Sequence, residues 1–127
     1  MGIRSNFSRL SDVDAPSTPG DRLEVQLRRT VDRLRTLGLA RLGASFEPEP
    51  TRADAAHRVA QRLADAAADL EGLERRPVPR LADSAVGDQV AVTGHDLLAA
   101  AAAADAVEGE AACAAAAELL LDLRRRL

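Results

Sequence analysis

Alanine dominates the last third of the chain. It fills every position from 99 to 104, and every position from 111 to 117 except 113. Because alanine has the highest helix propensity of the amino acids, we expect helix on both sides of the charged break at residues 105–109. The two helices would fold back on each other as a hairpin, and the rest of the chain would pack against it. Alanine faces bury little area, but they let another helix approach closely.

The first helix of this hairpin is expected to begin near residue 83 and to end at the break. Its apolar side chains share one arc at 100° per residue: Val86, Val90, Thr93, Leu97, Ala101 and Ala104. Asp88 and His95 lie nearly opposite that arc. The alternative for residues 88–94 is a short strand over 90–93 that ends at Gly94. In a helix, Gly94 costs roughly 1 kcal/mol relative to alanine, so we expect it to admit a neighbouring backbone at close range.

The second helix of the hairpin is expected over residues 110–126. One side of it is apolar: Cys113, Ala116, Ala117, Leu120, Leu123 and Leu127. Cys113 is the single cysteine, which excludes an intramolecular disulfide and a cysteine-based zinc site, and we interpret it as a small buried hydrophobe. The arginines at 124–126 complement the negative end of the helix dipole. A contact with phosphate or nucleic acid is the alternative role for them.

Two more amphipathic helices are expected in the first part of the chain. The first begins at Thr18 or Asp21, with Pro19 in its opening turn, and stops at Gly38. Leu39, Leu42 and Phe46 would form an extra turn or a cap over the core, and residues 47–50 a stiff extended linker. The second begins after Thr51, in a variant of the capping box with Asp54, and ends near Gly72. The segment 75–79, with two prolines, would connect it to the hairpin.

These four segments predict an all-α fold, an antiparallel four-helix bundle with short links and an irregular N-terminal arm. Residues 1–18 form the arm and residues 19–127 a single helical-bundle domain. The arm is polar apart from isolated apolar residues, of which Phe7 and Leu10 are the expected anchors. They would dock on the chain's own bundle or on that of another copy.

The amino-acid composition limits the classes of function that the chain can have. Hydrophobic residues make up 46% of the chain but aromatic residues only 2%, so the stacking platforms of single-strand nucleic-acid binders are excluded. The net charge is −3, which argues against a nucleic-acid partner, although arginines on the first helix give a weak alternative: Arg22, Arg28, Arg29, Arg33 and Arg35. Since there is no signal-peptide core and no apolar run of about 20 residues, we expect a cytoplasmic protein without membrane contact. All 17 basic residues are arginine, which is typical of a GC-rich genome and suggests an actinobacterial source.

The two histidines are the only residues whose spacing suggests a candidate metal site. In an antiparallel pair of helices, His57 and His95 would lie at similar heights, and Asp96 would add a carboxylate. A bundle of this size resembles, at the level of the fold, the metal-binding four-helix proteins of the DinB and mycothiol-dependent isomerase type. That resemblance implies a metal-dependent or small-molecule-binding enzyme as the alternative function. Those sites use three histidines and this chain has two, and His95 points away from the apolar arc of its helix, so we expect no metal and no cofactor.

No other catalytic pattern is present, since the chain has no glycine-rich phosphate loop and no nucleophile elbow. We therefore expect a non-catalytic helical bundle that acts by association with a partner protein or with itself. Its alanine-rich faces, 99–104 and 111–117, suit a homodimer. The alternative is that these alanines pack inside one monomer.

Overall fold

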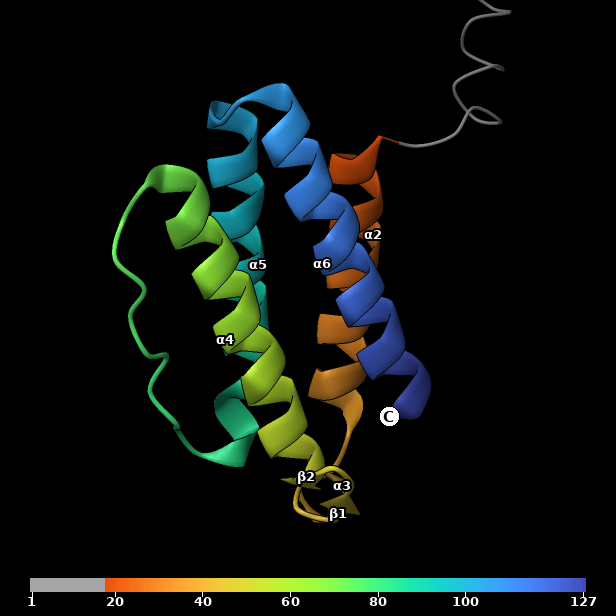
Figure 1. Cartoon of the computed structure of the whole chain (residues 1–127). Helices are drawn as coiled ribbons and strands as arrows, with labels where there is room; N and C mark the ends of the chain where they lie inside the picture. The colour runs from red at the N-terminus through yellow and green to blue at the C-terminus, as the bar shows by residue number, and fades with distance from the viewer. Residues whose placement is uncertain (1–17) are drawn as a thin grey trace, which may run out of the picture.

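The computed structural model describes residues 18–127, and four long helices make up most of it. They are α2 (Pro19–Thr36), α4 (Arg52–Glu71), α5 (Val86–Ala103) and α6 (Ala106–Arg126), and they pack into a helical bundle (Figure 1). The expected all-α bundle is confirmed. The expected arm with Phe7 and Leu10 lies outside the described residues, apart from Thr18.

The helix ends follow the local sequence signals. Thr18 and Asp21 form a complete capping box at the start of α2, and Thr51 accepts a hydrogen bond from the amide of Asp54 at the start of α4. Gly72 ends α4 in the left-handed conformation, with φ of 68°, which glycine adopts without steric cost. Residues 88–94 are helical, within α5.

The break in the alanine-rich half is shorter than expected. The carboxylate of Asp105 accepts hydrogen bonds from the amides of Val107 and Glu108, so α6 begins at Ala106 rather than at residue 110. Helix α2 is followed by a single turn of helix, α3 (Leu39–Leu42). The expected linker over 47–50 is instead part of a hairpin, in which residues 47–48 turn between two short antiparallel strands, β1 (Ser45–Phe46) and β2 (Glu49–Thr51). Phe46 is buried there as the expected cap over the core.

One connection differs from the expected short links. Residues 72–82, which we call the crossover, run back along the whole length of α4 to a short 3-10 turn, η1 (Asp83–Ala85), before α5 begins (Figure 1). Helices α4 and α5 are therefore parallel, and the assumption that this pair is antiparallel was wrong. Helices α2 and α6 are also parallel, whereas α5 and α6 form the expected antiparallel hairpin.

The hairpin of α5 and α6 organises the core. Both α2 and α4 pack against α5 and α6, and they make almost no contact with each other. Glycine brings the two hairpin helices together, because a Cβ added at Gly109 would lie 2.5 Å from the backbone oxygen of Ala101. At Gly94, the added Cβ would instead meet the side chain of Leu27 at 2.4 Å. The close backbone approach expected at Gly94 is thus found at Gly109.

The side chains of the core are leucine, valine and alanine, as the composition requires. Those most deeply buried include Leu23, Leu27, Leu34, Leu63, Val86, Val90, Leu97 and Leu120. Cys113 is buried among them, as expected. Over the described residues, no helix combines the length and the apolar content needed to cross a membrane.

Candidate functional site

His57 holds the crossover against α4. Its Nε2 atom lies 2.8 Å from the carbonyl oxygen of Val78. A carbonyl oxygen can only accept a hydrogen bond, so Nε2 must carry the hydrogen and donate it. The side chain that was considered as a metal ligand therefore fastens one segment of the chain to another.

His95 and Asp96 lie elsewhere, exposed on the outer face of α5. Because α4 and α5 run parallel, the early part of α4 that carries His57 faces the early part of α5, whereas His95 and Asp96 lie in the middle of α5. The expected similar heights depended on an antiparallel pair and are wrong. Between residues 18 and 127, no group of three or more His, Cys, Asp or Glu side chains could hold a metal ion. The structure thus does not assemble His57, His95 and Asp96 into a site.

Two glutamines extend the attachment of the crossover. Gln61 donates from Nε2 to the carbonyl oxygen of Arg76 at 3.0 Å and accepts at Oε1 from the amide of Val78 at 2.7 Å. Gln89 of α5 donates from Nε2 to the carbonyl oxygen of Pro79 at 2.7 Å. An extended segment has no internal hydrogen bonds, so these side chains satisfy backbone groups that otherwise depend on water. The crossover is consequently bound to both α4 and α5.

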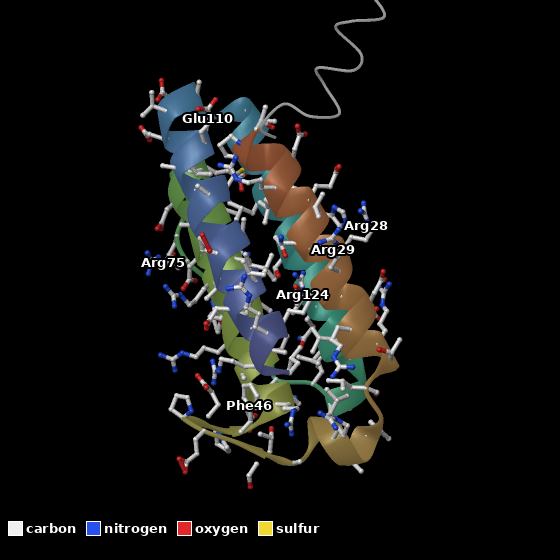
Figure 2. The ribbon with its side chains drawn as sticks, turned by 90° about the vertical axis from the view of Figure 1, so that its right-hand side faces the viewer. Arg28, Arg29, Phe46, Arg75, Glu110 and Arg124 are labelled. Atoms are coloured by element: carbon white, nitrogen blue, oxygen red, sulfur yellow. The ribbon has the colours of Figure 1, made fainter. Side chains whose placement is uncertain are left out.

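Ion pairs fasten both ends of the crossover. At one end, Arg75 (Figure 2) makes two hydrogen bonds of 2.9 and 2.7 Å with the carboxylate of Asp69. At the other, Arg80 lies 3.1 Å from Asp54 and 2.7 Å from Asp83. The hydrogen bond from Arg75 lowers the pKa of Asp69. The pKa of Asp54 is lowered first by the hydroxyl of Thr51 and then by Arg80.

The lowered pKa of Asp54 predicts a loss of stability in acid. A carboxyl whose pKa in the folded state lies below its ordinary value of 3.8 stabilises the fold above that pH. The contribution is lost as the pH falls through the folded-state pKa. We expect Asp54→Asn to make the free energy of unfolding, measured in urea at successive pH values, less dependent on pH below about 4. An unchanged acid dependence would contradict the assignment.

The histidines give a matched pair of variants. His57→Ala removes the hydrogen bond to Val78, and we expect a loss of about 1 kcal/mol in the free energy of unfolding. Amide exchange in the crossover should become faster as well. His95→Ala removes an exposed side chain and should change neither quantity. Equal effects of the two substitutions would show that His57 does not hold the crossover.

An apolar hollow of about 400 Å³ lies between the crossover and α5. We call it the crossover hollow, and it is lined by Val78, Leu81, Ala85, Asp88, Gln89, Val92 and Thr93. Leu81 and Val92 are 50% and 60% exposed, which is high for large apolar side chains. The Oε1 atom of Gln89 is buried and has no hydrogen-bond partner among the described residues. The hollow thus presents uncovered apolar surface, whereas the unpaired oxygen of Gln89 is enclosed by the chain itself.

The arginines at the end of α6 are engaged within the chain. Arg126 lies over the ring of Phe46, 4.6 Å from its centroid, and Arg124 donates to Oε1 of Gln26 at 2.6 Å. Burial lowers the pKa of Arg124, and the nearby charges of Arg29 and Arg125 lower it further (Figure 2). These contacts give Arg124 and Arg126 a structural role, in addition to their place at the end of the helix dipole.

No protein-family model matches the chain, and neither does any curated protein or solved structure.

Sequence reasoning missed the crossover and the polar residues that hold it. A signal for them was present, because polar side chains recur along α4 at intervals of three or four residues: Asp54, His57, Gln61, Asp65 and Asp69. Such a stripe is ordinarily interpreted as a solvent-exposed face. Here the same stripe receives an extended segment of the chain.

Proposed function

We propose that this protein is a non-catalytic helical bundle that acts by binding a partner protein at the crossover hollow. The supporting observation is the exposure of Leu81 and Val92 beside each other on the lining of one hollow. Apolar surface of this kind, rimmed by polar residues, is typical of sites of protein association. No described residue of the chain covers it.

Acidic side chains of α5 favour a basic partner: Asp88 lines the hollow, and Asp96 lies just outside its lining. Asp88 and Asp96 lie one turn before and one turn after Val92, on the same face of α5. Asp88 already pairs with Arg35 at 2.7 Å, whereas Asp96 has an exposed side chain. We infer a partner that inserts an aliphatic or aromatic side chain beside Val92 and presents a basic group to Asp96.

The alanine-rich faces give less support to association. Ala100, Ala116 and Ala117 are buried inside the bundle, where they allow the helices to approach. Ala99, Ala102 and Ala103 are exposed, but each offers only a methyl group. A homodimer through these faces would bury little apolar area per residue. The crossover hollow, with larger side chains, is the better candidate.

Val92→Arg tests the proposal, with Val107→Arg as its matched control. Both valines are exposed, at 60% and 75%, so neither substitution should disturb the core. We expect the wild-type protein and Val107→Arg to capture the same protein from the native host. Val92→Arg should bind that protein, once purified, at least about tenfold more weakly, a loss of about 1.4 kcal/mol.

Two results would contradict the proposal. One is equal binding of the purified partner by both variants, which would place the contact elsewhere. The other is self-association of the pure protein in sedimentation equilibrium that Val92→Arg abolishes. The occupant of the hollow would then be a second copy of the chain rather than a different protein.

A further inference from the structure

A second hollow, of about 360 Å³, lies at the end of the bundle where the described chain begins. We call it the tip hollow. Thr18, Pro19 and Gly20 line one side of it, and residues from the end of α5 and the start of α6 line the other: Leu98, Ala101, Ala102, Ala104, Ala106, Gly109, Glu110 and Cys113. The tip of the hairpin projects past the first turn of α2 (Figure 1), so α2 leaves this flank of the hairpin uncovered.

We propose that the tip hollow is covered by residues 3–10 of the same chain, with Phe7 and Leu10 as the inserted side chains. The connection supports this occupant, because the residue that precedes Pro19 itself lines the hollow. Seven residues separate Leu10 from Thr18, which at about 3.4 Å per residue is more than enough chain to reach any part of the lining.

The side chains of residues 3–10 complement the lining. Ile3, Phe7 and Leu10 are large apolar residues of this segment. The floor of the hollow is mainly alanine, and small residues leave room for a large ring such as that of Phe7. Leu98 adds a larger apolar contact on the same floor.

Charge complementarity points to the same segment. The first ten residues contain Arg4 and Arg9 and no acidic residue. Glu110, on the rim of the tip hollow, is exposed (Figure 2), as are Asp105 and Glu108 at the start of α6. A basic apolar segment therefore meets an acidic rim around an apolar floor.

Fluorescence tests this proposal in the full-length chain, which has no tryptophan and no tyrosine. Phe7→Trp introduces a single indole, and we expect its emission to be shifted to shorter wavelength and protected from acrylamide. Adding Ala102→Arg fills the hollow and repels the basic segment, so the emission should shift to that of an indole in water. Ala115→Arg, an exposed alanine of α6 outside the hollow, should leave the emission unchanged.

Cys113 provides a second readout that does not depend on the introduced indole. It is the only cysteine and lines the tip hollow. Phe7→Asp should make its thiol react several-fold faster with a disulfide reagent, and Val13→Asp, outside residues 3–10, should not. A water-exposed indole together with an unchanged thiol rate would overturn the proposal. Emission that shifts to longer wavelength on dilution would overturn it too, since it would assign the hollow to residues 3–10 of a second copy.

Discussion

Gly109→Ala is expected to destabilise the protein, although alanine is the better helix former. The added methyl group would lie 2.5 Å from the backbone oxygen of Ala101, a contact that cannot be relieved by rotating a side chain. That oxygen also accepts the amide of Ala104 at the end of α5, so moving it disturbs the hairpin turn. Overpacking should cost about 3 kcal/mol. The gain in helix propensity is roughly 1 kcal/mol, which leaves a net loss of about 2 kcal/mol in urea unfolding.

Substitutions of two other glycines provide comparisons for the stability effect of Gly109→Ala. Gly94→Ala also meets a close contact, but with the end of the Leu27 side chain, which can adjust its rotamer, so the loss should be smaller. Gly20→Ala, in the first turn of α2, meets nothing closer than 3.9 Å and should be neutral or stabilising. If Gly109→Ala proved as harmless as Gly20→Ala, the hairpin helices would not be as close as the structure shows.

Leu120→Ala should strongly destabilise the protein. Leu120 is fully buried on α6, which, like α5, packs against each of the other three long helices. Its backbone oxygen accepts a hydrogen bond from the buried hydroxyl of Thr30 on α2. Removing its side chain leaves a cavity that neighbouring alanines are too small to fill. We expect a loss of about 2–5 kcal/mol in the free energy of unfolding, measured by urea denaturation.

Leu39→Ala is the control for this truncation. It removes the same atoms from a side chain that is 65% exposed on α3, and the free energy of unfolding should change little. Comparable losses for the two variants would mean that burial of Leu120 is not what stabilises α6.

The sequence predicted the elements of the fold well, because their signals are local. Thr18 with Asp21, Thr51 with Asp54, and Gly72 each mark a helix end through contacts within one turn. The apolar arc of α5 was continuous through residues 88–94, and the helical interpretation of that segment is confirmed. The close approach of α6 to α5 also follows from composition, since the residues that meet there, Gly109 and Ala101, are small.

The path of the chain between helices could not be predicted in the same way. Residues 72–82 contain two prolines and no apolar periodicity, a composition equally compatible with a tight turn and with an extended crossover. Whether α5 runs parallel or antiparallel to α4 depends on whether the connection is a tight turn or an extended crossover. It is decided by contacts between distant residues, such as the one between Gln61 and Val78. The similar heights expected for His57 and His95 were wrong for this reason, and the bond from His57 to a backbone carbonyl is one that no side-chain pattern reveals.

The near absence of contact between α2 and α4 has a consequence for partial unfolding. Each of these long helices packs mainly on the hairpin, so one can detach while the other keeps most of its interface. Departure of α4 would also release the crossover from the side chains of α4 that hold it, whereas departure of α2 would leave those bonds in place. The fold therefore allows the protein to open from two sides independently.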